Sequence, residues 1–113
     1  MRAQIYCGRF APSPTGPLHR GSLVAALASY VDARAHCGKW LIRIENTDTP
    51  RERPDAVRQQ LASLAALGLV SEEALLFQST RTAAYDAALQ QLRSEGRVYY
   101  CRCSRAHLSL IHI

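Results

Sequence analysis

The chain alternates between short apolar runs and longer segments in which apolar residues recur at helical spacing. Two of the runs, at residues 5–10 and 40–44, predict strands. The segment between them, residues 21–36, has the period of a helix. Strand, helix and second strand together predict a right-handed crossover unit with parallel strands. The expected fold class is therefore α/β, a parallel sheet flanked by helices.

The helical segments have apolar residues that predict which face of each helix is buried. The first helix is expected to end before Gly38, and its alanines permit close packing on a sheet. Its apolar positions are Leu23, Leu27, Tyr30 and Val31. A second helix is expected to have Pro54 in its first turn and to end at Gly68. Its apolar face comprises Val57, Leu61, Leu64 and Leu67.

The remaining segments predict a short extended piece and a third helix. Residues 75–77 are apolar and follow a polar loop, so a brief extended segment is expected there. Residues 82–95 predict a helix that Gly96 ends, and residues 98–103 predict extended chain or a turn. The apolar face of this third helix is expected to point inward; it comprises Tyr85, Leu89 and Leu92.

A polar loop at residues 9–22 connects the first strand to the first helix. Its three prolines exclude helix and sheet, and its glycines allow the backbone to bend or a ligand to approach closely. A strand, a tight loop and a helix N-terminus present backbone N–H groups and a positive dipole end to a phosphate. The loop is therefore a candidate phosphate-binding site.

Arg9, at the start of this loop, and Glu45 are expected to lie at the same edge of the sheet. Ligands bind at the carboxyl ends of parallel strands, and both the loop and Glu45 follow such ends. Arg9 can hold a carboxylate through two parallel hydrogen bonds. A lone acid after an apolar strand needs a partner. Each residue also has a structural alternative: a surface ion pair for Arg9, and a pair with Arg43 or Arg51 for Glu45.

Charge and cysteine content are compatible with a phosphate-binding α/β protein. Fourteen Lys and Arg against nine Asp and Glu give a net charge of +5, concentrated at both ends of the chain. This excess suits ATP or RNA, although a solvated basic surface is the alternative.

No secretory signal and no membrane-spanning run is found. The irregular spacing of the four cysteines predicts no disulfide framework, so a reduced cytoplasmic compartment is expected.

The loop also resembles a known family. Its letters PSPTGPLHRG are similar to the signature of class I glutamyl-tRNA synthetases, with residues 19–22 in the place of their HIGH tetrapeptide. The segments GSLVAAL and WLIRIENTDTPR resemble one branch of that family, the glutamyl-Q tRNA(Asp) synthetases. The resemblance extends over residues 5–105, which would be the N-terminal part of a Rossmann-like nucleotide-binding catalytic domain.

The resemblance implies an activity and a set of site residues. Glutamate would react with ATP, which carries Mg²⁺, to give glutamyl-adenylate, and the glutamyl group would pass to the queuosine base of tRNA(Asp). A monomeric enzyme is expected. His19 would have a catalytic role at the ATP phosphates. The glutamate-binding residues implied are Arg9, Phe10, Ala11, Pro12, Ser13 and Glu45. The ATP-binding residues implied are Pro12, Thr15, Gly16, His19, Gly21 and Ser22.

Two further positions bear on this resemblance. Cys101 and Cys103 resemble the first half of a zinc site, whose other ligands would have to come from elsewhere, because a structural zinc takes four. Asn46 departs from the family pattern, which usually has Asp after the letters RIE. That change puts in doubt the contact that the Asp would make.

The end of the chain matches the family least. Residues 106–113 form a tail without a recognisable pattern, and we expect the chain to be incomplete. The family's second signature, a lysine-rich loop resembling KMSKS, does not occur in these 113 residues. Two alternatives therefore stay open: an ordinary glutamyl-tRNA synthetase that charges tRNA(Glu), and an inactive nucleotide- or RNA-binding fragment.

Overall fold

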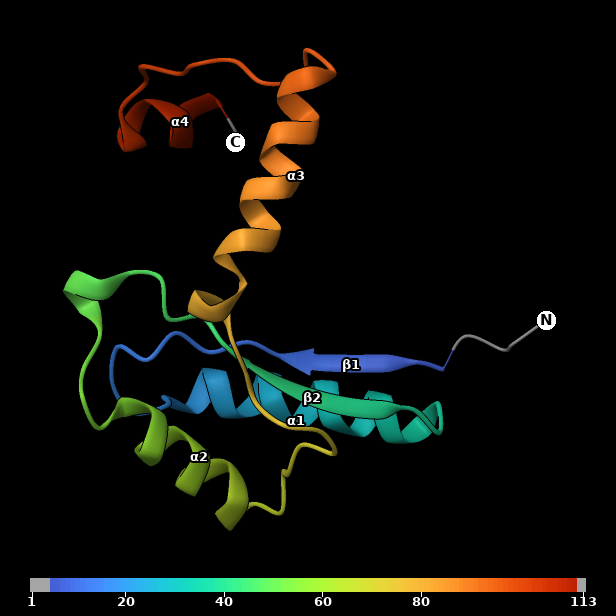
Figure 1. The fold of residues 1–113 in the computed structure, drawn as a ribbon. Helices are drawn as coiled ribbons and strands as arrows, with labels where there is room; N and C mark the ends of the chain where they lie inside the picture. The colour runs from blue at the N-terminus through green and yellow to red at the C-terminus, as the bar shows by residue number, and fades with distance from the viewer. Residues whose placement is uncertain (1–4, 112–113) are drawn as a thin grey trace. The chain divides into compact units, whose positions relative to one another are not determined.

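The computed structural model describes residues 5–111, and its helices and strands follow the expected order (Figure 1). The described chain forms two units, which divide between Thr82 and Ala83. The first contains the sheet and two helices, and the second contains mainly helix. Residues 112 and 113, part of the predicted tail, lie outside the described residues.

Three parallel strands form the sheet of the first unit, in the order β1-β2-β3. They are β1 (Cys7–Phe10), β2 (Lys39–Ile44) and β3 (Leu76–Phe77). Gly8 pairs with Trp40, and Arg43 pairs with Leu76. The parallel α/β fold class is confirmed. The first strand begins at Cys7 rather than at residue 5.

Helix α1 (Arg20–Ala35) packs on the sheet through its small residues. Ala26 and Ala33 are completely buried, and a Cβ atom on Gly8 would lie 3.0 Å from the Cβ of Ala33. Larger side chains do not fit at this separation. Leu27 and Val31, which the helical spacing placed on the buried face, are 49% and 55% exposed instead.

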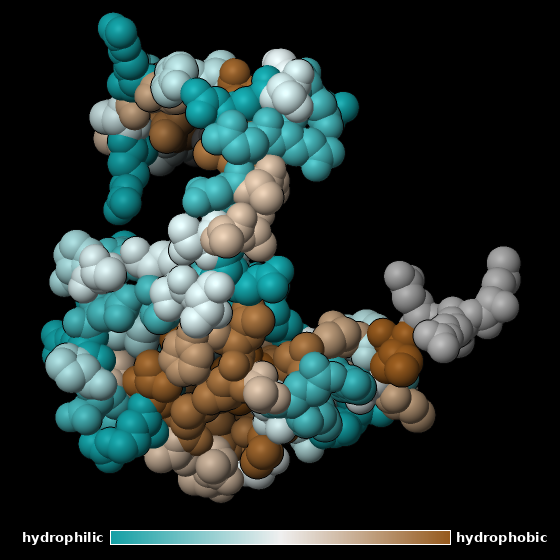
Figure 2. Space-filling model, viewed as in Figure 1, coloured by the Kyte–Doolittle hydropathy of each residue, from teal (hydrophilic) through white to brown (hydrophobic). Residues whose placement is uncertain are grey.

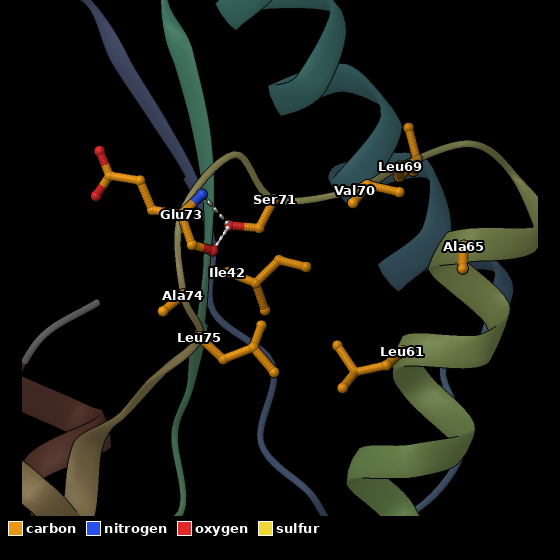
Figure 3. A pocket seen from close by; sticks show the side chains of 9 residues that line it. All are labelled: Ile42, Leu61, Ala65, Leu69, Val70, Ser71, Glu73, Ala74 and Leu75. Atoms are coloured by element: carbon orange, nitrogen blue, oxygen red, sulfur yellow. Dashed lines mark hydrogen bonds between the residues drawn. The ribbon is translucent and has the colours of Figure 1, made fainter.

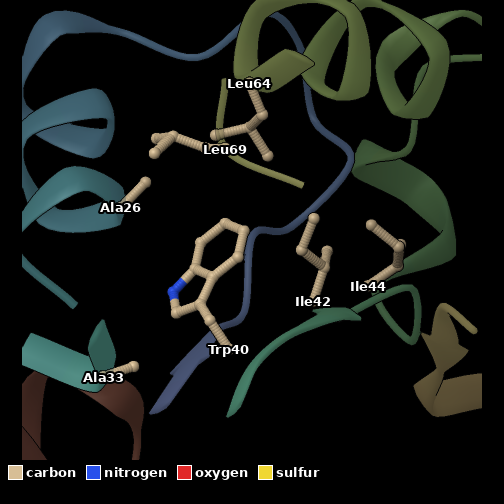
Figure 4. Close-up of a cluster of buried hydrophobic side chains, with 7 residues drawn as sticks. All are labelled: Ala26, Ala33, Trp40, Ile42, Ile44, Leu64 and Leu69. Carbon is tan, nitrogen blue, oxygen red and sulfur yellow. The ribbon is translucent and has the colours of Figure 1, made fainter. Parts of the chain in front are cut away.

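The hydrophobic core lies on one face of the sheet, where alternate residues of β2 meet side chains from both helices (Figure 4). The strand contributes Trp40, Ile42 and Ile44, and α1 contributes Ala26 and Ala33. Helix α2 (Ala56–Ala66) and the turn after it contribute Leu64 and Leu69. The two helices therefore cover the same face of the sheet.

Helix α2 begins slightly later than its sequence predicts. The short η1 (Thr49–Arg51) occupies the polar turn before it. Asp55 is the N-cap residue, so Pro54 precedes the helix and is not in its first turn. Gly68 follows the C-terminus with a φ of 74°, the left-handed conformation that glycine adopts at low cost.

Helix α3 (Thr82–Ser94) begins at the boundary between the units, and η2 (Gln78–Arg81) precedes it in the first. The second unit contains the rest of α3, an irregular segment and the short α4 (Arg105–Ile111). Tyr85, Leu89 and Leu92 are 39%, 45% and 42% exposed, so the prediction that they point inward is wrong for the described residues. Such a face normally packs on another layer. Besides α3 itself, residues 83–111 form α4 and an irregular segment. The C-terminal tail, where the sequence predicted no pattern, contains most of α4.

Candidate active site

The loop at residues 9–22 surrounds a hollow of about 360 Å³ between β1 and the start of α1. Five of the six residues expected to bind ATP line this hollow: Pro12, Thr15, Gly16, His19 and Ser22. Four of those expected to bind glutamate also line it: Phe10, Ala11, Pro12 and Ser13. Gly21 is not part of the lining. The structure thus brings most of the predicted loop residues around one space.

Backbone hydrogen bonds hold the loop against the carboxyl end of β2. The Glu45 N–H donates to the Pro12 carbonyl over 2.9 Å, and the Arg53 N–H donates to the Pro14 carbonyl over 2.9 Å. Both donors follow β2 in the chain. These bonds place Glu45 beside the loop, as the parallel-strand argument predicts.

Gln60 is a site residue that the sequence analysis missed. It is only 2% exposed, lines the same hollow, and its Nε2 donates to the carbonyls of Ser13 (2.9 Å) and Gly16 (2.7 Å). A signal was present, because Gln60 interrupts an apolar helix face between Val57 and Leu61. A polar residue at such a position needs hydrogen-bond partners.

His19 forms the N-cap of α1 and is fixed by Ser22. The His19 Nδ1 accepts the Ser22 N–H over 3.2 Å, and its Nε2 lies 3.0 Å from the Ser22 Oγ. The imidazole is exposed. A ring at a helix N-terminus, the positive end of the helix dipole, suits contact with an anion.

Glu45 lies in a second hollow of about 210 Å³, which Ser13 and Thr15 also line. Its carboxylate forms an ion pair with Arg43, with Oε1 2.8 Å from Nε, and its side chain is 26% exposed. The pair that the sequence left open as an alternative is therefore present. Asp48 also lines this hollow, and the hydrogen bond that it accepts raises the pKa of Arg51.

Arg9 lies apart from both hollows. It is exposed on β1 and lines a space of about 240 Å³ with Leu41 and Arg43. Gly8, the residue before it, is buried against α1, so Arg9 belongs to the opposite face of the sheet. Within residues 5–111, its guanidinium has no hydrogen bond or ion pair, so it is free to bind an anion.

Asn46 connects the end of β2 to the segment before α3. Its Oδ1 accepts the Ser79 N–H over 3.0 Å, and its Nδ2 donates to the Ser79 Oγ over 2.8 Å. The residue that departs from the family pattern therefore has a structural partner. An Asp could accept both of these hydrogen bonds.

A separate apolar hollow of about 330 Å³ lies between β2 and α2, under the segment that leads to β3 (Figure 3). Figure 2 shows apolar side chains gathered in this part of the first unit. Ile42, Leu61 and Leu75 are among the residues that line it. None of the predicted site residues lines this hollow.

The cysteines supply too few ligands for a metal in this part of the chain. Cys101 and Cys103 are exposed free thiols, and Cys7 and Cys37 are free as well. No group of three His, Cys, Asp or Glu side chains within residues 5–111 could hold a metal ion. A structural zinc needs four ligands, so the described residues do not complete a zinc site.

The parallel sheet and the loop at its carboxyl edge define a class of protein: they match the catalytic-domain fold of class I aminoacyl-tRNA synthetases. A family model described as tRNA synthetases class I (E and Q), catalytic domain, matches residues 7–112. The chain therefore belongs to the class I glutamyl- and glutaminyl-tRNA synthetase family.

Curated relatives point to one branch of this family. A glutamyl-Q tRNA(Asp) synthetase from Burkholderia orbicola (strain MC0-3) is 59% identical over 104 residues, which are 92% of this chain and 35% of the relative. A protein of the same name from Leptothrix cholodnii is 55% identical over 106 residues. The chain spans 35% of the length of each of these relatives.

Solved structures support the same fold. A glutamate tRNA ligase from Elizabethkingia meningosepticum, in complex with its amino acid, superimposes with a TM-score of 0.78 at 33% identity. The match covers 96% of this chain and 23% of that protein. A glutamate-tRNA synthetase from Elizabethkingia anophelis gives a TM-score of 0.79, also at 33% identity.

Proposed function

We propose that this chain is the N-terminal part of the catalytic domain of a ligase that activates glutamate with ATP. The observation that carries the proposal is the bond between the Glu45 N–H and the Pro12 carbonyl, because it places an acid beside the loop of a class I synthetase fold. Ser13 and Thr15 share a hollow with this acid. An ammonium group near a carboxylate is stabilised electrostatically, so Glu45 suits the α-amino group of an amino acid.

The remaining loop residues have complementary roles in this proposal. Arg9 binds the side-chain carboxylate of glutamate, for which its exposed guanidinium, paired with none of the described residues, is available. A substrate carboxylate oxygen attacks the α-phosphorus of ATP, a new P–O bond forms, and pyrophosphate leaves with its Mg²⁺. His19 and the N–H groups near Gly21 and Ser22 stabilise the charge that develops on the phosphate oxygens, by position and electrostatics.

The acceptor that we propose is the queuosine base of tRNA(Asp). The names of the relatives at 55–59% identity support this choice. The nearest alternative is the 3′ end of tRNA(Glu), which the names of the solved structures favour. Both reactions use the same glutamyl-adenylate, so the site geometry described above is compatible with either acceptor.

Several properties of the whole protein belong to the same proposal. Residues 1–105 would be part of one catalytic domain that works as a monomer in the cytoplasm. No helix among residues 5–111 has both the length and the apolar character needed to cross a membrane. We infer that the 113 residues alone do not turn over, because they contain no KMSKS-like loop to hold the leaving phosphates.

Zinc enters this proposal only through Cys101 and Cys103. We infer that these thiols supply two ligands, and that the others come from outside the described residues. Metal analysis of the complete protein tests the idea: zinc should be present at one equivalent and lost in the double variant Cys101→Ser, Cys103→Ser. Equal zinc content in both proteins would contradict it.

The acceptor is tested by supplying labelled glutamate and ATP to the complete protein with one RNA at a time. The RNAs are tRNA(Asp) with queuosine, tRNA(Asp) with guanine at that position, and tRNA(Glu). The proposal expects label only on the first. Label on tRNA(Glu) would assign the protein to the ordinary synthetases, and the guanine-containing tRNA is the matched control.

A further inference from the structure

Gln60 differs from every other side chain in the core of the first unit, because it is polar and almost fully buried. Its side chain is 2% exposed, and among residues 5–111 no other polar or charged residue is buried to this degree. Removing an amide from water is unfavourable unless its groups find hydrogen-bond partners. The identity of those partners therefore indicates what the residue does.

Both hydrogen-bond partners of the Gln60 amide belong to the loop at residues 9–22. Its Nε2 donates to the Ser13 carbonyl at 2.9 Å and to the Gly16 carbonyl at 2.7 Å. These contacts cross 47 and 44 residues of sequence. One side chain thus connects α2 to two points of the loop, on either side of Pro14 and Thr15.

Backbone groups provide the other bonds to the loop carbonyls. The Pro12 and Pro14 carbonyls accept the N–H groups of Glu45 and Arg53, and the Ser13 carbonyl also accepts the Thr15 N–H, all at 2.9 Å. Together, these backbone N–H groups and the Gln60 side chain donate hydrogen bonds to the carbonyls of Pro12, Ser13, Pro14 and Gly16. A loop rich in proline has few N–H groups of its own, so the carbonyls of Pro12, Pro14 and Gly16 take donors from outside it.

The other end of the Gln60 amide has no such partner. Its Oε1 is buried and accepts no hydrogen bond from the described residues. A buried acceptor without a partner is destabilising, and an apolar side chain of similar size would avoid that cost. The two bonds from Nε2 are therefore the physical reason for an amide at this position.

We propose that Gln60 is a positioning residue that fixes the loop in the shape required for binding. Ser13 lines the hollow that contains Glu45, and Gly16 lines the hollow that contains His19. One amide therefore ties together the walls of the proposed glutamate and ATP sites. The predicted effect of Gln60 on activity rests on the proposed function, whereas its predicted effect on the shape of the loop does not.

The first test replaces Gln60 with methionine, which keeps the length of the side chain and removes both donors. In the complete protein, glutamate-dependent exchange of pyrophosphate into ATP should lose at least tenfold in kcat/KM, with KM raised for both glutamate and ATP. Gln59→Met is the matched control, because Gln59 is exposed on the same helix. This control should stay within twofold of the wild type.

A second variant separates positioning from packing. In Gln60→Glu, a carboxylate would face two carbonyl oxygens and repel them, whereas the protonated acid can donate one hydrogen bond. Activity relative to the wild type should therefore rise as pH falls from 8 to 6 (roughly the range in which buried carboxyl groups titrate). A purely structural role predicts no such recovery. This variant also carries the test if Gln60→Met does not fold.

Amide hydrogen exchange tests the loop without any substrate. In Gln60→Met, the N–H groups of Thr15, Glu45 and Arg53 should exchange at least tenfold faster, while those in the middle of α1 should not change. Unchanged loop exchange together with unchanged kcat/KM would overturn the inference. A wild-type protein without glutamate-dependent exchange, but with the expected loop exchange, would instead overturn only the proposed function.

Discussion

Gly21 lies directly against the imidazole ring of His19. A Cβ atom on Gly21 would be 3.0 Å from Cε1 and 3.1 Å from Nδ1 of His19. This contact is tighter than side chains normally make, so the ring would have to move to accommodate a methyl group. Gly21 therefore allows His19 to keep its position as the N-cap of α1.

Gly21→Ala should consequently lower the activity while leaving the stability of the fold almost unchanged. Alanine favours a helix over glycine by about 0.5–1 kcal/mol, while a displaced His19 weakens its cap bond to Ser22 by a similar amount. We expect the free energy of unfolding to change by less than ~1 kcal/mol and kcat/KM for pyrophosphate exchange to fall at least tenfold. Ala28→Gly, on the exposed face of α1, should show the reverse pattern. Full activity in Gly21→Ala would mean that the position of His19 is unimportant.

We expect Arg9 to contribute to glutamate binding and not to the stability of the fold. Hydrogen bonds to charged groups contribute about 1.5–3 kcal/mol, so Arg9→Met should raise KM for glutamate by roughly 10–100-fold. The free energy of unfolding should change by less than ~0.5 kcal/mol, because no described residue pairs with its guanidinium. Arg9→Lys should recover only part of the loss, because lysine lacks the planar fork of donors.

A control for Arg9 is available on α2. Arg58 is exposed and forms a surface pair with Asp55 at 3.3 Å. Arg58→Met removes the same charge without touching the site, so its KM for glutamate should equal that of the wild type. Similar KM values for Arg9→Met and Arg58→Met would remove Arg9 from the proposed site.

The Asn46–Ser79 pair predicts different results for two substitutions. Asn46→Ala loses two hydrogen bonds at a partly exposed position, and should lower the free energy of unfolding by about 1 kcal/mol. Asn46→Asp can accept both bonds, and should stay within ~0.5 kcal/mol of the wild type. Urea denaturation measures the difference. Equal losses in the two variants would show that side-chain charge matters here, rather than hydrogen bonding.

Tyr6 gives a prediction at alkaline pH. The hydrogen bond that its hydroxyl donates to Asp32 is the main cause of a raised Tyr6 pKa. The folded state therefore favours the neutral phenol, and this stabilisation is complete below the unfolded pKa of about 10. It is lost as pH rises through the folded pKa. Lys39, whose pKa Glu73 raises, contributes in the same range but is present in every variant compared.

The measurement compares the wild type with Tyr6→Phe across this range. The difference in free energy of unfolding should be constant between about pH 7 and 9 and should shrink above about pH 10. A difference that does not change with pH would show that the Tyr6–Asp32 bond does not contribute to stability.

The strands and helices were predictable because short-range patterns determine them. Alternate burial along β2, at Trp40, Ile42 and Ile44, follows from the strand period. The buried face of α1 was not predictable in this way. It depends on how closely the helix approaches Gly8, which is a property of two segments far apart in the sequence.

The residues of the candidate site also fall into two groups, those that a contiguous segment identifies and those that depend on long-range contacts. The loop from Arg9 to Ser22 is contiguous, so its residues could be identified from the sequence, and fourteen consecutive positions carried the family resemblance. The parallel-strand argument also placed Glu45 beside it correctly. Gln60 and the Asn46–Ser79 pair depend on contacts across more than thirty residues, and helix periodicity alone does not specify the partner of a buried amide.

The most direct test of the central claim is glutamate-dependent exchange of labelled pyrophosphate into ATP by the complete protein. It should be run with each amino acid in turn, both without RNA and with tRNA(Asp) or tRNA(Glu). The proposed function predicts exchange with glutamate and at least a hundredfold less with glutamine or aspartate. Absence of exchange with glutamate under every RNA condition would contradict the account.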